Sequence, residues 1–222
     1  MKGGPVTNVA RLFAFISRNA FLADTSGVRN GLMNTQTAHL YGAEDQTMVD
    51  NAHTETWTLD DGNKLTLRHI APGDAIIEQA FVRKLSVQSR YLRFHGSIKE
   101  LSKKDLETFT NPDPLNAEAL IILYKGEISE EEIGVARFII DPDGKSCEFA
   151  IVVADEWQNR GLGAKLMKAL ISHAQSRGIK RIHGSVLKDN SGMLQFIKGL
   201  GFEETTDPDD SSVTQVTKYL RD

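Results

Sequence analysis

The sequence predicts a mixed α/β fold in which one mainly antiparallel sheet is covered by helices. Residues 64–70 alternate apolar and polar side chains, which indicates a half-buried strand. Three apolar segments joined by short turns, at 119–124, 133–140 and 148–153, indicate an antiparallel meander. From Leu166 onward the apolar residues recur every three or four positions, so the period changes from that of a strand to that of a helix.

Short helices are expected between the first strand and the meander. Ser102 should cap one that runs to Phe109, because a serine hydroxyl can accept a hydrogen bond from a free N–H of the first turn. Another should cover 89–95. A third begins at 72–74 and has an apolar face made of Ile76, Ile77, Ala80, Phe81, Val82 and Leu85.

The segment after the meander alternates helices and strands. A strand is expected at 179–187, a helix at 191–198 with Asn190 as its N-cap, and a last hairpin whose second arm is 213–220. The first helix of this part has an apolar stripe made of Leu166, Met167, Leu170, Ile171 and Ala174. The short connections favour one domain.

Composition excludes several classes of protein. With 222 residues, 40% of them hydrophobic, the chain can bury a core, and 25% charged residues are an ordinary surface. A net charge of -4 argues against nucleic acid as a partner, and no apolar run reaches the roughly 18–20 residues that a membrane span needs. The single cysteine, Cys147, excludes an internal disulfide and fits a reduced, cytoplasmic setting.

No metal is expected. The histidines His69, His95, His173 and His183 show no metal-ligand spacing in the sequence. A cysteine-rich metal site is excluded by the cysteine count.

Residues 1–56 differ in composition from 57–222, so we expect an N-terminal extension followed by one domain. A short amphipathic helix is predicted in the extension, and we expect this helix to pack on the domain or on a partner. The alternative is a targeting peptide, but polar residues interrupt the apolar run, which is unlike a secretory signal. The helix would use Val9, Leu12, Phe13, Ile16 and Phe21.

A glycine-containing loop at 158–164 carries the first chemical signal. It stands between the strand at 148–153 and a helix, and a helix start exposes unpaired N–H groups that attract anions. Glycines there let a diphosphate approach the backbone closely. The alternative is a turn that only caps the helix. A P-loop is excluded because no Gly-Lys-Ser/Thr ending follows, and Leu166 stands where the dinucleotide fingerprint needs its third glycine.

Two motifs in this order resemble the GNAT superfamily of N-acetyltransferases. Gln158-x-x-Gly161-x-Gly163 is similar to the acetyl-CoA loop of that family. Asn190, followed by Leu200-Gly201-Phe202, resembles the family's second signature, an Asn-led helix that ends in Leu-Gly-Phe. The resemblance implies a GNAT-like fold, with helices on both faces of a mixed, mainly antiparallel sheet.

One branch of the family is particularly similar. The segments LTLRHIAPGD, SRYLRFHG, GVARFIIDPD and EFAIVVADEWQNRGLG look like the acetyltransferase domain of bacterial Pat-type protein-lysine acetyltransferases. The resemblance covers roughly 57–220 and implies acetyl-CoA as the acetyl donor.

The resemblance assigns the cofactor site residue by residue. It implies that the strands carrying 151–153 and 184–187 splay apart and that the pantetheine arm pairs with the first of them. Asn190 is expected near the pantetheine or the thioester. Arg160 is either a diphosphate partner or a solvated cation. The implied cofactor-binding residues are Ile151, Val152, Val153, Gln158, Asn159, Arg160, Gly161, Leu162, Gly163, Ala164 and Asn190.

Glu148 is the candidate general base. A lysine amine titrates near about 10.4, so a group must accept a proton before the amine attacks a thioester. The Pat-like branch places its proposed base in a matching EFA segment; the alternative is an ordinary carboxylate in a salt bridge. The family's usual acid, a tyrosine in the Asn-led helix, is replaced by Ile197, which leaves Ser185 or water.

The leading hypothesis is a cytoplasmic acetyltransferase that moves acetyl from acetyl-CoA directly to an amine, with a protein lysine suggested by the Pat-like resemblance. The alternatives are a small-molecule amine acceptor and a non-catalytic acyl-CoA-binding module. The oligomeric state stays open, with a dimer among the alternatives. An acidic group near the last hairpin either attracts a cationic acceptor or only forms a turn: Glu203, Glu204, Asp207, Asp209 and Asp210.

Overall fold

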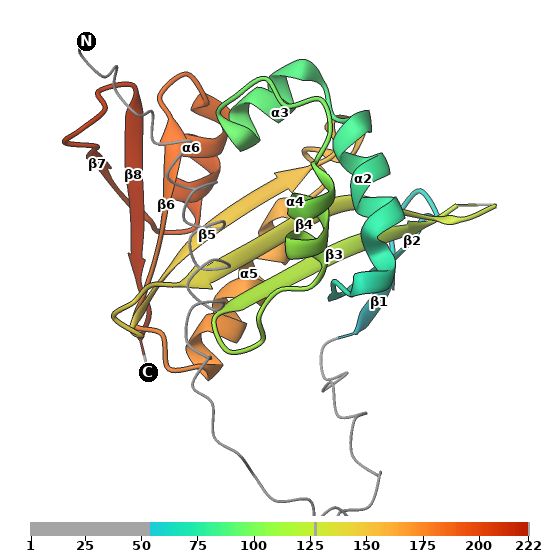
Figure 1. Cartoon of the computed structure of the whole chain (residues 1–222), viewed down its shortest axis with the longest axis horizontal. Coiled ribbons are helices and arrows are strands. Elements are labelled where there is room, and N and C mark those ends of the chain that lie inside the picture. The colour runs from blue at the N-terminus through green and yellow to red at the C-terminus, as the bar shows by residue number, and fades with distance from the viewer. Residues whose placement is uncertain (1–53, 127, 222) are drawn as a thin grey trace, which may run out of the picture.

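The computed structural model describes residues 54–126 and 128–221, and within them eight strands form one sheet (Figure 1). The strand order is β1-β2-β3-β4-β5-β6-β8-β7, and every neighbouring pair is antiparallel except the parallel pair β5 and β6. The strands are β1 Glu55–Thr58, β2 Lys64–His69, β3 Ala117–Lys125, β4 Glu130–Ile140, β5 Ser146–Val153, β6 Arg181–Leu187, β7 Glu203–Thr206 and β8 Val213–Tyr219.

Helices cover both faces of this sheet. In Figure 1, α2 and α4 lie in front of the central strands and α5 lies behind them, which confirms the predicted α/β arrangement. No helix in the described part of the chain is long and apolar enough to cross a bilayer. The helices are α2 Ala75–Lys84, α3 Val87–Phe94, α4 Lys103–Thr110, α5 Leu162–Ser176 and α6 Ser191–Gly199.

The core lies on both sides of β3 and β4. Leu120, Ile121, Ile122 and Leu123 follow one another in β3, and none is more than 2% exposed. A strand covered on both faces needs apolar side chains at every position, so it loses the alternation of a half-buried strand. This explains the unbroken apolar run in the sequence.

Two boundaries differ from the predictions. Strand β1 was not expected, because its four residues are mostly exposed and show no apolar alternation. The domain boundary expected between residues 56 and 57 falls inside this strand. α3 begins at Val87, earlier than predicted, because the Ser86 hydroxyl accepts a hydrogen bond from the Ser89 N–H and caps it. The amphipathic helix predicted within 1–56 falls before residue 54 and lies outside the described residues.

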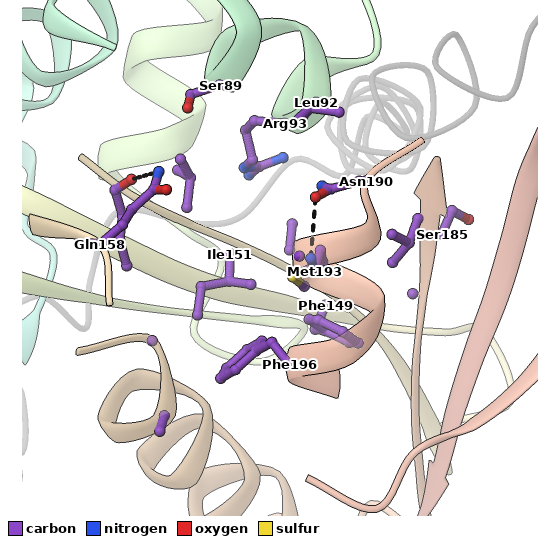
Figure 2. A pocket seen from close by; sticks show the side chains of 18 of the residues that line it. Ser89, Leu92, Arg93, Phe149, Ile151, Gln158, Ser185, Asn190, Met193 and Phe196 are labelled. Atoms are coloured by element: carbon purple, nitrogen blue, oxygen red, sulfur yellow. Dashed lines mark hydrogen bonds between the residues drawn. The ribbon is translucent and has the colours of Figure 1, made fainter. Parts of the chain in front are cut away.

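The parallel strands β5 and β6 separate part-way along their length. Their last paired residues are Glu148 and His183, and β5 then continues to Val153 without β6. A Cβ atom at Gly184 would lie 2.8 Å from the Phe149 ring, so only glycine leaves room for that ring where the strands part. Figure 2 shows Ile151 and Ser185 on the two sides of the resulting opening. The predicted splay is confirmed.

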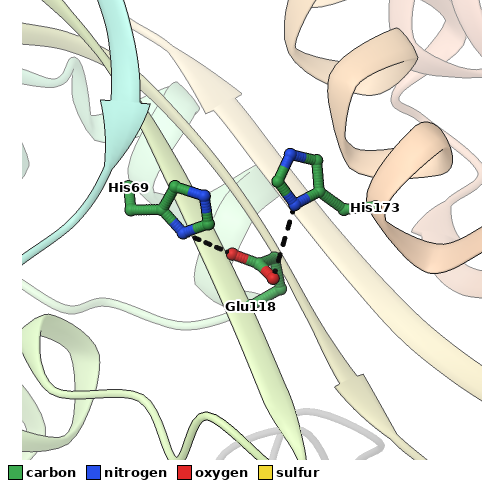
Figure 3. A group of neighbouring side chains, drawn as sticks. All are labelled: His69, Glu118 and His173. Carbon is green, nitrogen blue, oxygen red and sulfur yellow. Dashed lines mark ion pairs between the residues drawn. The ribbon is translucent and has the colours of Figure 1, made fainter. Parts of the chain in front are cut away.

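Three side chains from separate elements meet between the sheet and α5 (Figure 3). Nδ1 of His69 in β2 lies 2.8 Å from Oε1 of Glu118 in β3, and Nδ1 of His173 in α5 lies 3.6 Å from Oε2. Their ligand atoms all lie within 4.8 Å of one another, close enough for a metal ion. Sequence spacing overlooked this group because its members come from three elements.

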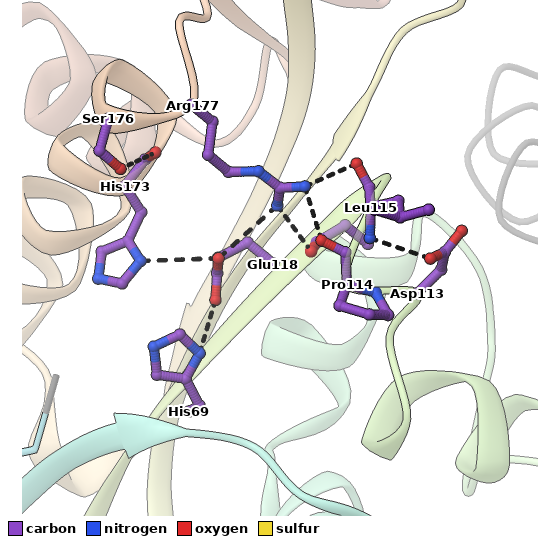
Figure 4. Close-up of polar contacts among 9 residues, drawn as sticks. His69, Asp113, Pro114, Leu115, Glu118, His173, Ser176 and Arg177 are labelled. Atoms are coloured by element: carbon purple, nitrogen blue, oxygen red, sulfur yellow. Dashed lines mark hydrogen bonds and ion pairs between the residues drawn. The ribbon is translucent and has the colours of Figure 1, made fainter. Parts of the chain in front are cut away.

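Arg177, just after α5, adds a cation to the same carboxylate (Figure 4). Its Nη1 lies 3.8 Å from Oε2 of Glu118, and Nη2 donates to the Pro114 and Leu115 carbonyl oxygens at 2.8 and 2.6 Å. Burial would raise the pKa of Glu118, but hydrogen bonds from His173 and His69 outweigh it and hold the pKa at about 2. We interpret the group as an ion-pair network that holds α5 to the sheet. A bound divalent metal ion is the less favourable interpretation, because the positive charge of Arg177 would repel it.

Glu118→Gln should lower the free energy of unfolding at pH 7 by about 1.5–3 kcal/mol, the usual size of a hydrogen bond to a charged group. Because the pKa falls from 4.5 to about 2 on folding, the ionised carboxylate stabilises the protein above pH 4.5, and this stability is lost as pH falls toward 2. Urea unfolding at pH 7 and pH 3 measures both effects, with the exposed Glu107→Gln as control.

Equal stability of wild type and Glu118→Gln at both pH values would contradict the ion-pair network. A rise in the melting temperature with added Zn²⁺, present in wild type and absent in Glu118→Gln, would identify a metal site instead.

Candidate functional site

The opening between β5 and β6 leads into a cavity of about 420 Å³. Its walls come from α3, β5, the loop before α5, β6 and α6, so segments far apart in the sequence converge there (Figure 2). Every predicted site residue lines it except Arg160 and Leu162. Those that do are Glu148, Ile151, Val152, Val153, Gln158, Asn159, Gly161, Gly163, Ala164 and Asn190.

The loop before α5 presents backbone N–H groups to one end of the cavity. Gly161 is the N-cap residue of α5 at φ 79°, a left-handed conformation that glycine adopts without strain. No side chain caps the helix, so its first N–H groups keep their hydrogen-bonding capacity for a ligand. The Gln158 amide donates to the Val153 carbonyl at 3.0 Å and fixes the loop to the end of β5. The arrangement suits an anionic group at the positive end of the helix.

The two predicted loop residues outside the cavity have other partners. Nη1 of Arg160 lies 2.9 Å from Oδ2 of Asp61, and its guanidinium carbon lies 4.9 Å from the centre of the Trp157 ring. The Leu162 side chain is buried in the core, so only its backbone can serve the loop.

Glu148 lies at the opposite end, where β5 and β6 stop pairing. Burial raises the pKa of this carboxyl above its ordinary value; His183 and Arg93 oppose the rise, and Asp141 adds to it. His183 itself contacts Asp141, with Nε2 2.8 Å from Oδ2. A raised pKa brings a carboxylate closer to the range in which a general base works at neutral pH.

The other carboxylates near the loop, Asp155 and Glu156, do not line the cavity. Asp155 accepts hydrogen bonds from the Ser86 N–H at 2.9 Å and from the Ser86 and Ser89 hydroxyls at 2.7 Å each, so it fixes the start of α3. Glu156 is exposed in the short turn before the loop. Glu148 is therefore the carboxylate that lines the cavity among the described residues.

Asn190 has a structural role that explains its position. Its side-chain oxygen accepts a hydrogen bond from the Met193 N–H at 3.2 Å, which caps α6 and keeps the residue at the cavity wall (Figure 2). Ile197, about two turns beyond Asn190, is fully buried. Of the described residues that line the cavity, none is a tyrosine, and Ser185 contributes a hydroxyl.

In the last hairpin, one of the five acidic residues has a structural role in the turn. Asp207 is 6% exposed and accepts hydrogen bonds from the N–H groups of Asp209 and Asp210 and from the Gln215 amide. It therefore holds the turn together and cannot attract a ligand from solvent. Asp210 acts to raise the pKa of His95, a residue of the cavity wall, so this part of the loop lies within electrostatic reach of that wall.

Sequence reasoning missed the wall that α3 forms. Ser89, Leu92, Arg93 and, just beyond the helix, His95 line the cavity opposite β5. No signal in the sequence indicated this wall: Arg93 is only 8% exposed in the structure, but an arginine in a short helix pattern is expected at the surface.

Comparisons with known proteins agree with this geometry. Residues 86–202 match the model of a family described as the acetyltransferase (GNAT) family. The chain is 33% identical over 163 residues to acetyltransferase PA5475 of Pseudomonas aeruginosa, covering 73% of this chain and 87% of that protein. It is 30% identical over 141 residues to acetyltransferase Pat of Mycolicibacterium smegmatis, covering 63% of this chain but 41% of that protein.

Solved structures agree as well. The crystal structure of the GNAT domain of S. lividans PAT aligns with a TM-score of 0.67 and 27% identity, over 75% of this chain and 97% of that one. RimL, a ribosomal L7/L12 α-N-protein acetyltransferase solved with coenzyme A, shares the fold with a TM-score of 0.54 and 17% identity, over 70% of this chain and 94% of that one. The chain belongs to the GNAT family of acetyltransferases.

Proposed function

We propose that this protein is a cytoplasmic enzyme that transfers acetyl from acetyl-CoA to a lysine side chain of a protein. One observation carries the proposal: a single cavity has free helix N–H groups at one end and a buried carboxyl, Glu148, at the other. GNAT acetyltransferases use acetyl-CoA as the acyl donor, and the cavity fits that molecule chemically. The Pat-like motifs and the matches to two Pat proteins support a lysine acceptor.

In the proposed binding mode, the N–H groups at the start of α5 hold the diphosphate. The stretch 151–153 of β5 has no β6 partner, so its free polar groups can pair with the amides of the pantetheine arm. This orientation directs the thioester toward Glu148.

The proposed reaction is a direct attack. The neutral amine nitrogen forms a bond to the thioester carbonyl carbon, the carbon–sulfur bond breaks, and Glu148 receives the proton that the amine loses. The leaving thiolate takes a proton from water, either directly or through the Ser185 hydroxyl, which then recovers its proton from that water. Cys147 is not a suitable covalent carrier, because burial raises its pKa to about 12 and keeps it a thiol.

Gly163→Glu should abolish acetyl-CoA binding, because it adds a negative charge beside the proposed diphosphate site. Gly163→Ala is the matched control: its Cβ would meet the Phe196 ring at 3.5 Å, an ordinary contact, so binding should persist. Acetyl-CoA at 100 times its Kd should stabilise wild type and the alanine variant by roughly 2.7 kcal/mol and leave the glutamate variant unchanged. Equal stabilisation of all three would refute the phosphate-loop assignment.

Glu148→Gln should retain acetyl-CoA affinity and lower turnover by roughly 10²–10⁴-fold. Because the base must be ionised and its pKa is raised, wild-type kcat/KM should decline on acidification at a pH above the ordinary carboxyl value of 4.5. Residual activity of the variant should rise with pH as more free amine becomes available. Glu156→Gln, an exposed carboxylate of the same segment, should behave as wild type. Turnover of Glu148→Gln within a few-fold of wild type at every pH would leave Glu148 a structural role.

The acceptor is tested by measuring CoA release with lysine-containing proteins and with small amines such as polyamines. We expect a protein acceptor to have the higher kcat/KM. Asp209→Asn combined with Asp210→Asn should lower this value several-fold at low salt, because a cationic acceptor loses electrostatic attraction, and salt should reduce the difference. Asp207 is left intact so that the turn persists.

Three results would contradict this part of the proposal. A preference for small amines would identify the small-molecule alternative, and acetyl-CoA binding without CoA release would identify a binding module. Coinciding salt profiles of wild type and the double variant would leave the acidic loop a turn only.

A further inference from the structure

Arg93 is a buried side chain that the proposed reaction does not use. It is 8% exposed, and its side chain extends from α3 into the cavity toward the strand that carries Ile151 (Figure 2). The cation therefore lies in the wall opposite the proposed path of the pantetheine arm.

No carboxylate among the described residues forms an ion pair with this guanidinium; Glu78 and Glu148 act on it only from beyond ion-pair distance. Its Nε has no hydrogen-bond partner, and its recorded neighbour is the ring of Phe94, 5.1 Å from the guanidinium carbon. Arg137 offers a comparison: it is equally buried and its Nε also has no partner, but its Nη2 donates to both carboxylate oxygens of Glu78 at 3.1 and 3.2 Å. A buried charge without a partner is strongly unfavourable, so proteins rarely keep one without a ligand.

Arg93 stays charged at neutral pH, because its pKa, although lowered, still lies above that pH. Burial lowers its pKa to about 9, Arg137 acts in the same direction, and Glu78 and Glu148 oppose the change. The influence of Glu148 also indicates which end of the cavity Arg93 serves. It belongs to the end with the proposed base, and the diphosphate loop lies at the other.

We propose that Arg93 binds a carboxylate of the substrate beside the reacting centre. A planar guanidinium with paired N–H donors matches a carboxylate, which it can bind through two parallel hydrogen bonds. The carboxylate belongs either to the acceptor, as the chain terminus or an acidic side chain beside the target lysine, or to the acyl chain, as in a dicarboxylic thioester. This inference rests on the proposed acyl-transfer function and specifies what that function selects.

Two matched pairs of ligands distinguish the sources. Succinyl-CoA and butyryl-CoA have acyl chains of equal length, and only the first ends in a carboxylate. Lysine and cadaverine are both diamines, and only lysine carries a carboxylate. Binding is measured by calorimetry, with the amines added to the CoA-bound protein, so that the result does not require turnover; CoA release is measured in parallel.

Wild type should bind the carboxylate-bearing member of one pair at least about tenfold more tightly than its partner, as expected for an ion pair removed from water. Arg93→Met should abolish that preference by weakening only the carboxylate-bearing ligand, and Arg93→Lys should retain part of it. Preference within the thioester pair assigns the carboxylate to the acyl chain. Preference within the amine pair assigns it to the acceptor.

Stability provides a second, independent readout. Arg93→Met replaces a buried, unpaired cation with an apolar chain of similar length, so it should raise the melting temperature of the ligand-free protein. A purely structural arginine would show the opposite.

Equal binding within both pairs by wild type would overturn the proposal. So would an Arg93→Met variant that melts earlier and weakens all four ligands alike. Because CoA release with acetyl-CoA is followed separately, acetyl transfer without any carboxylate preference refutes only the role of Arg93. Binding preference without CoA release refutes only the catalytic function.

Discussion

The separation of β5 from β6 is the constraint on which the site depends. Hydrogen bonding between these parallel strands ends at Glu148 and His183, and the Phe149 ring occupies the space that a side chain at position 184 would need. Phe149 in turn packs against Phe202, with ring centres 5.4 Å apart, so the opening is braced from the last hairpin. A paired β6 would satisfy the polar groups of 151–153 and leave no cavity.

The same opening creates the electrostatic contrast of the site. At one end, the free N–H groups of α5 form a positive region that is exposed to ligand. At the other, Glu148 is buried, and its raised pKa follows from removal from water. Arg93 adds a cation at this second end and opposes that rise. In the proposed binding mode, a ligand that carries a diphosphate and a reactive carbonyl would be oriented by charge as well as by shape.

Most of the fold and the phosphate-binding loop of the candidate site could be predicted from the sequence, for physical reasons. The strands and helices after Ala117 follow strong periodic patterns, and the loop at 158–164 is a continuous motif. Contacts between segments that are far apart in the sequence leave no periodic pattern or continuous motif, so they could not be predicted. β1 is short and polar, and His69, Glu118 and His173 come from three separate elements. Arg93 reaches the cavity only because α3 packs against β5. Charged residues appear solvated in a sequence pattern until tertiary packing buries them.

The place of Ile197 narrows the choice of proton donor for the leaving thiolate. Because its side chain is fully buried, this face of α6 belongs to the core, and the residue there contributes packing in place of a polar group. Ser185 lines the cavity from β6. Its hydroxyl accepts a hydrogen bond from the Gln215 amide nitrogen at 3.1 Å and donates a longer one to the Gln215 amide oxygen at 3.4 Å, so it can donate to a thiolate only by giving up that weak contact. Thiols titrate near about 8.5, so a thiolate is a stable enough leaving group to depart with only this weak donor or a water molecule. The loss of the tyrosine is therefore compatible with catalysis.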